Sequence, residues 1–117
     1  MPTIEIVDGA LNIELSGAEK FAALSGSLSF PMSHVHSVEV DEKVVDHLGL
    51  RAPGVHLPGV IAAGTYYHDG DRQFVYWHHD EIAVVVNLTD EKYDQLILGV
   101  PGSKADAEAL VARLSQG

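Results

Sequence analysis

The chain contains no cysteine, which excludes disulfide bonds, thiolate metal sites and a thiol nucleophile. It also lacks any apolar run near the roughly 18 residues that a membrane-spanning helix needs, and its apolar runs are short, such as Ile82–Val86. The opening residues MPTIEIVDG have no basic start followed by an apolar block, so they do not predict a signal peptide. Together these absences predict a cytoplasmic protein without membrane insertion.

Basic residues are scarce as well. Seven Lys and Arg stand against 17 Asp and Glu, which gives a formal net charge of −10. The basic residues are scattered singly along the chain, at Lys20, Lys43, Arg51, Arg72, Lys92, Lys104 and Arg113. Nucleic acid and anionic lipid both require concentrated positive charge, so neither is an expected partner. The acidic excess is most simply a solubility feature.

The patterns that are present favour one domain spanning residues 1–117, because this length and a 46% apolar content suit a single core. The opening residues TIEIVDGALNIEL predict a β-hairpin turning at Asp8-Gly9, the dipeptide that a two-residue turn with positive φ prefers. Folding about that turn pairs Ile6 with Leu11 and places both on one face.

Alternating and apolar segments predict further strands, at 27–30, 35–40, 60–68, 73–79, 82–88 and 96–100. The unbroken apolar run Ile82–Val86 indicates a strand covered on both faces. Short helical turns are predicted at 16–24 and 41–49. The segment Arg51–Gly59, RAPGVHLPG, is rich in proline and glycine and is predicted to be a long loop.

A C-terminal amphipathic helix completes the predicted elements. Ser103 is its expected cap, with the acidic Asp106 three residues later near the positive end of the helix. Its apolar residues recur at i, i+3, i+4 and i+7, namely Ala107, Leu110, Val111 and Leu114. The whole pattern predicts an α+β fold that is mainly β: a bent antiparallel sheet or small barrel of seven to eight strands, capped by this helix.

The segments LSFPMSHVHSVEV and GLRAPGVHLPGVIAAGTYYHDGDRQFVYWHHDEIAVVVNLTDEKYDQLILGV, with the terminal helix, resemble the bacterial pleckstrin-homology-like (PH-like) domains. The resemblance covers nearly the whole chain and is similar in detail to small proteins of high-GC Gram-positive bacteria. It implies a bent antiparallel sandwich with a C-terminal helix, and a binding or assembly module that tends to oligomerise. It implies no shared catalytic motif and no cofactor. The basic pocket of the relatives that bind phosphoinositides has no counterpart here.

The chain is rich in histidine, with residues at 34, 36, 47, 56, 68, 78 and 79. The order His34, His36, Glu39 suggests a cupin-like metal site as an alternative. In a regular strand, however, His34 and His36 share one face while Glu39 lies on the other. The neighbours His78 and His79 face opposite ways for the same reason. The expectation is therefore no metal, and the alternative is a zinc or iron site using His34 and His36 with one of His56, His78 or His79.

Aromatic residues gather on two successive strands, at Tyr66, Tyr67, Phe74, Tyr76 and Trp77. Alternation sends Phe74 and Tyr76 to one face and Trp77 to the other. Either one set is exposed for a protein interface, or both sets are covered within the monomer. The candidate interface residues are two from this group and three from the predicted loop: Pro53, His56, Pro58, Tyr67 and Trp77.

The sequence contains no phosphate-binding glycine loop and no nucleophile elbow. The function predicted is a non-enzymatic module that binds protein, with self-association as the expected mode, through sheet edges. It has no catalytic residue and no cofactor. The competing class is a small cupin-like metal-dependent enzyme using His34 and His36. A third class, a small-molecule binder, would require an apolar cavity under the helix.

Overall fold

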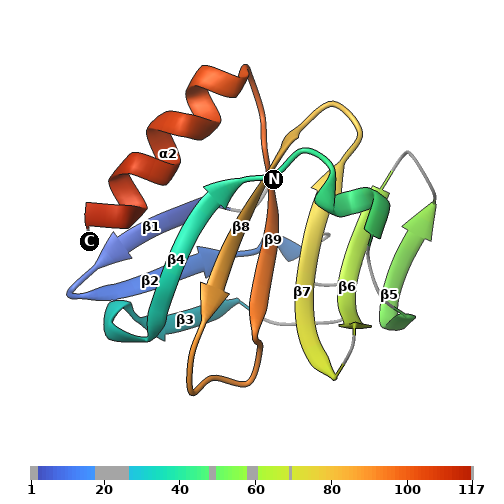
Figure 1. The fold of residues 1–117 in the computed structure, drawn as a ribbon, viewed down its shortest axis with the longest axis horizontal. Helices are drawn as coiled ribbons and strands as arrows, with labels where there is room; N and C mark the ends of the chain where they lie inside the picture. The colour runs from blue at the N-terminus through green and yellow to red at the C-terminus, as the bar shows by residue number, and fades with distance from the viewer. Residues whose placement is uncertain (1–2, 18–26, 48–49, 58–60, 69, 117) are drawn as a thin grey trace.

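Two open β-sheets and one C-terminal helix make up the described part of the chain (Figure 1). The computed structural model describes residues 3–17, 27–47, 50–57, 61–68 and 70–116, with the side chains of these residues apart from 46–57, 68 and 116. Strands account for most of the elements, so the predicted α+β class with a mainly β body is confirmed.

The smaller sheet has the order β1-β2-β3, with β1 at Thr3–Val7, β2 at Ala10–Glu14 and β3 at Leu28–Pro31. The predicted hairpin is confirmed, because Ile6 pairs with Leu11 in the expected register. Asp8 and Gly9 have φ angles of 52° and 74°, the positive values that the two-residue turn requires.

The larger sheet has the order β4-β8-β9-β7-β6-β5. Its strands are β4 Val35–Val40, β5 Leu50–Leu57, β6 Ile61–His68, β7 Asp71–His78, β8 Ile82–Leu88 and β9 Gln95–Val100. Short 3₁₀ turns precede β4 and β5, namely η1 at Met32–His34 and η2 at Val44–His47. The predicted turn at 16–24 lies almost wholly outside the described residues.

One pairing departs from the predicted all-antiparallel sheet: β7 and β9 run parallel, with Val75 opposite Ile97. The strand β9 follows β8 along the chain but inserts between β8 and β7, so it is antiparallel to β8 and parallel to β7 (Figure 1). The described residues form nine strands, more than the seven or eight predicted, and the sheets remain open.

The predicted loop at Arg51–Gly59 is wrong over most of its length, because Leu50–Leu57 forms the edge strand β5. Pairing with β6 steps by three residues from Arg51 to Gly54 on β5 but by two on β6, which is a bulge. Proline is tolerated at bulges and on edge strands, since it cannot donate to a ladder. Gly64, opposite Gly54, has a φ of 133° that suits glycine.

Two hydrophobic cores lie on the two faces of the larger sheet. The first core, under the smaller sheet and the helix, includes Leu11, Phe30, Phe74, Leu96, Leu98 and Leu114. The second core is made by Ala62, Tyr66, Val75, Ala83, Val85 and Ile97. On β8, Val86 belongs to the first core and Val85 to the second, so the prediction of a strand covered on both faces is confirmed.

The helix α2 spans Lys104–Gln116 and begins after Ser103, as predicted. The Ser103 amide donates to Asp106 Oδ2 at 2.8 Å, and the Asp106 amide donates to the Ser103 hydroxyl at 3.4 Å. This reciprocal cap satisfies amides that the first helical turn leaves free. The helix packs on β4 and β8 through the predicted stripe: Ala107, Leu110 and Leu114 are buried and Val111 is half-buried.

Candidate functional site

The histidines of the HVH stretch do not lie in a regular strand. His34 is the last residue of η1. In the pairing of β4 with β8, Val35 lies opposite Leu88 and Ser37 lies opposite Asn87, so β4 has one extra residue over this stretch. His36 is therefore the extra residue of a β-bulge, and its side chain is exposed. The expectation that His34 and His36 share one strand face is wrong, because it assumed an unbroken strand.

His34 has a partner distant in sequence. Its Nδ1 contacts Glu91 Oε2 in the loop after β8, and its carbonyl accepts the Thr89 amide at 2.9 Å. The two contacts fasten η1 to the β8–β9 loop. A structural tie of this kind explains His34 without a metal ion.

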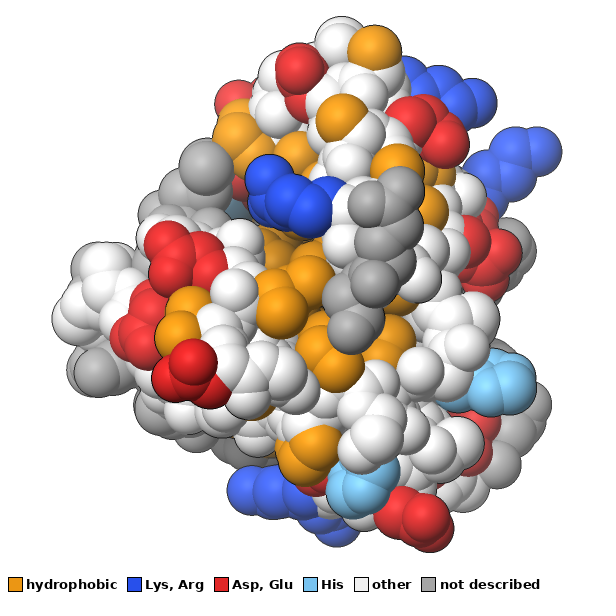
Figure 2. Space-filling view, turned by 90° about the vertical axis from the view of Figure 1, so that its left-hand side faces the viewer, with side chains coloured by type: hydrophobic (Ala, Val, Ile, Leu, Met, Phe, Trp, Pro, Cys, Tyr) orange, Lys and Arg blue, Asp and Glu red, His pale blue; other side chains and the backbone are white. Residues whose placement is uncertain are grey.

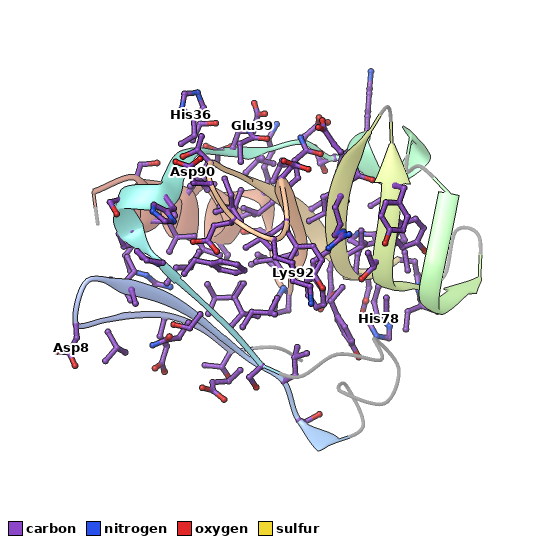
Figure 3. All side chains as sticks on the ribbon, turned by 90° about the horizontal axis from the view of Figure 1, so that it is seen from below. Asp8, His36, Glu39, His78, Asp90 and Lys92 are labelled. Carbon is purple, nitrogen blue, oxygen red and sulfur yellow. The ribbon has the colours of Figure 1, made fainter. Side chains whose placement is uncertain are left out.

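The alternative metal site is not assembled in the described residues. Strands β8 and β9 separate β4 from β7, which places His36 and His78 about 14 Å or more apart across the sheet. Figure 3 shows His36 and Glu39 on the opposite side of the molecule from His78. No group of three His, Asp or Glu side chains among the described residues could hold a metal ion. His79 is exposed in the β7–β8 turn, and the side chain of His56 is not described.

Tyr67 and Trp77 do not form one surface. Tyr67 pairs with Arg72 on the first-core face of the sheet, whereas Trp77 pairs with Ala62 and packs on the second core. Tyr67 is 42% exposed with the Arg72 guanidinium 5.5 Å from its ring centre, while the Trp77 indole donates to the Glu81 carbonyl at 3.0 Å. The two candidates therefore lie on opposite faces of the sheet. Phe74 and Tyr76 are buried, Trp77 is half-buried, and Tyr67 is exposed. Pro53 and His56 lie on β5, and Pro58 falls outside the described residues.

The buried phenol of Tyr76 on β7 should make the stability of the fold depend on pH in the alkaline range. Burial, and secondarily the negative charge of Glu81, raise the pKa of Tyr76 above its ordinary value of 10.0. Above that value the unfolded chain ionises first, so the free energy of unfolding falls as pH rises toward the folded-state pKa. We expect Tyr76→Phe to reduce this alkaline loss. Urea unfolding at several pH values between neutral and alkaline checks it, and identical pH profiles for both proteins would contradict it.

The outer edge of β5 is one candidate contact surface. In the described residues β5 pairs with β6 alone, so its other edge presents unpaired backbone groups. All 17 acidic residues lie outside positions 47–68, the segment that includes β5 and β6. Neither β5 nor β6 therefore carries a carboxylate, although the chain is strongly acidic. The segment proposed for contact from the sequence was expected to be a loop, and over Leu50–Leu57 it is a strand.

A second candidate surface is a groove between β1 and α2. It has a volume of about 350 Å³ and lies between the start of β1, the end of β9 and one side of the helix. Its lining residues are Thr3, Ile4, Gly99, Val100, Pro101, Asp106, Ala109, Leu110 and Arg113. Figure 2 shows apolar side chains gathered in this region with a basic side chain across them. A neighbouring hollow lined by β1 from Thr3 to Ile6 shares Arg113 and extends the groove.

The groove was missed at the level of sequence because its walls come from residues about 100 positions apart. The available signal was local: Asp106, Ala109, Leu110 and Arg113 recur at helical spacing and form a second stripe beside the core stripe. The groove runs along one side of the helix and includes Asp106 and Arg113, so it differs from the apolar cavity under the helix that a small-molecule binder would need.

Comparisons with known proteins are sparse. No family model and no solved structure matches the chain. Glucosamine-6-phosphate deaminases from three strains of Bifidobacterium longum are 37% identical to it over 62 residues. This match covers 51% of the chain and 23% of each of those enzymes, so the chain spans about a quarter of their length.

No described helix is long and apolar enough to cross a membrane.

Proposed function

We propose that this chain is a non-enzymatic, cytoplasmic protein-binding module of the PH-like type, which acts by pairing with a second copy of itself along the outer edge of β5. The observation that carries the proposal is an edge strand, unpaired on one side among the described residues, that lies in the longest segment of the chain without acidic residues. The mainly β body with one C-terminal helix supports the PH-like part of the proposal, although β7 and β9 run parallel and not antiparallel.

Electrostatics favour this edge for self-association. Two copies that each carry a net charge of −10 repel one another over most surfaces. At β5 the local residues are apolar apart from Arg51 and His56, so contact there brings no carboxylates together. Strand addition would satisfy backbone groups that β5 otherwise leaves to water, and would join two six-stranded sheets into one.

The deaminase likeness supports no competing function. The shared segment is 23% of those enzymes, too small a part to bring over the activity of the whole. A deaminase activity is therefore not part of the proposal, and neither is the cupin-like metal chemistry that His34 and His36 suggested.

The test is the mass of the protein in solution. We expect sedimentation equilibrium to give about twice the chain mass of 12.6 kDa at high protein concentration. An antiparallel pair centred on Pro53 and Gly54 brings Arg51 of one copy near His56 of the other. The double variant Arg51→Glu/His56→Glu then sets like charges against each other and should weaken the dimer by about tenfold or more.

A matched control variant distinguishes negative charge added at the β5 edge from the same charge added elsewhere. The variant Lys92→Glu/His79→Glu makes the same change in charge at exposed positions in two loops away from β5. It should leave the dissociation constant within about threefold of the parent, because distant charges are largely screened at physiological salt. A chain that stays monomeric at every concentration contradicts the proposal, and so does equal weakening in both variants, with circular dichroism confirming that each remains folded.

A further inference from the structure

The helix α2 and the smaller sheet form one layer, and the groove between β1 and α2 is a gap in that layer. The helix and the strands β1, β2 and β3 all cover the first-core face of the larger sheet (Figure 1). Between α2 and β1 the end of β9 forms part of the floor, through Val100 and Pro101. The half-buried Ile4 and the buried Leu110 both line this gap. An element inserted here would complete the layer.

The edge of β1 determines what kind of element fits. In the described residues β1 pairs with β2 alone, so the backbone edge that remains unpaired is its other edge. An extended chain can add to such an edge through main-chain hydrogen bonds, with every second side chain directed into the adjoining groove. The apolar lining at Ile4, Val100 and Ala109 suits apolar side chains at those alternate positions.

The charge of the groove indicates which charged side chain the occupant should carry. Arg113 lines both parts of the groove, and the ion pairs among the described residues join His34 to Glu91 and Lys104 to Glu42. Arg113 is therefore not engaged by a carboxylate there. Two carboxylates line the groove as well. Asp106 already accepts the Ser103 amide at 2.8 Å and its hydroxyl at 3.2 Å, and the exposed Glu5 of the neighbouring hollow is not in an ion pair with Arg113. A guanidinium at an apolar groove is complementary to a carboxylate on the occupant.

We propose that this groove binds an extended segment of another protein, which adds as a strand to the edge of β1 and carries apolar side chains at alternate positions with an Asp or Glu that pairs with Arg113. The site goes beyond self-association through β5. It lies beside α2 and β1, at the other end of the molecule from β5 (Figure 1), so the two sites can be occupied together.

The test begins with a selection of binding peptides from a random library. The intact chain is immobilised and challenged with phage-displayed random peptides about ten residues long, which is enough for one strand. We expect the enriched peptides to alternate apolar and polar residues, with an acidic residue on the apolar side. A synthetic peptide of the enriched sequence, titrated against Arg113→Ala, should bind about tenfold or more weakly than to the parent, as expected for loss of a charged partner in a partly desolvated site.

Two tryptophan variants decide where the peptide binds. Ala109 is exposed and lines the groove, so Ala109→Trp should fill the groove and abolish binding. Ala112 is also exposed on the same helix but does not line the groove, so Ala112→Trp should leave binding unchanged. The failure of any peptide to enrich, a basic or non-alternating consensus, or equal loss in both variants would overturn the proposal. The dimer mass of Ala109→Trp, expected to be unchanged, keeps this test separate from that of self-association.

Discussion

Replacing Phe74 by alanine is expected to lower the free energy of unfolding by about 3–5 kcal/mol. Phe74 is 0% exposed on β7 and belongs to the first core, where it packs edge-to-face on Tyr93 with 5.6 Å between ring centres. Truncation would remove the apolar area of the ring, the aromatic contact and the packing around it. A single domain has about 5–15 kcal/mol of stability in total, so this one change consumes a large share of it.

The matched control is Tyr67→Ala on the neighbouring strand. Tyr67 lies on the same sheet face but is 42% exposed, and the Arg72 guanidinium lies 5.5 Å from its ring centre. Its loss should cost about 1 kcal/mol or less, because an exposed cation–π contact is weak. Chemical denaturation of both variants measures the difference. Equal costs for the two would mean that Phe74 does not lie in a core.

Elements fixed by local chemistry were predictable from the sequence. The Asp8-Gly9 turn selects the hairpin type, and the turn then selects the register of β1 on β2. The cap at Ser103 and the stripe that follows define α2 in the same way. In each case the interacting residues are a few positions apart, so the sequence pattern contains the whole interaction.

Elements that depend on distant partners were not predictable in the same way. The segment Leu50–Leu57 reads as a loop because of Pro53 and Gly54, yet pairing with β6 makes it a strand and a bulge absorbs the proline. The insertion of β9 beside β7 is equally invisible, since no local pattern specifies a parallel neighbour. Tertiary pairing overrides local propensity in both cases.

The candidate site residues show the same contrast between local interactions, which the sequence pattern contains, and distant ones, which it does not. Alternation correctly separated Phe74 and Tyr76 from Trp77, because those three lie on one strand. It could not relate Trp77 to Tyr67, since that requires the pairing of β6 with β7, which puts Ala62 opposite Trp77. The tie between His34 and Glu91 spans 57 positions and was hidden for the same reason.

Replacing Gly99 by alanine is expected to cost about 1–3 kcal/mol of stability, the usual range for forcing an extra carbon into a packed site. A Cβ at Gly99 would lie 2.9 Å from Cδ of Glu81 and closer still to its Oε1. That carboxylate cannot move freely, because Oε1 accepts the His78 amide at 2.8 Å and the Glu81 carbonyl accepts the Trp77 indole at 3.0 Å. The cost therefore includes a hydrogen bond to a charged group, which is among the stronger kinds.

A double-mutant cycle isolates this cause. In a Glu81→Ala background the carboxylate is gone and only the Cβ of residue 81 remains, 3.1 Å from the added Cβ. Gly99→Ala should therefore cost about 1 kcal/mol less in this background than in the parent, and the two substitutions should couple. Gly17→Ala is the matched control, since a Cβ there meets no atom within 4 Å. A cost at Gly99 that is the same in both backgrounds would show that backbone preference, and not the Glu81 carboxylate, makes glycine necessary on β9. A cost that falls when the Glu81 carboxylate is removed would establish that this side chain holds the β7–β8 turn against β9, which lies between β8 and β7 in the larger sheet.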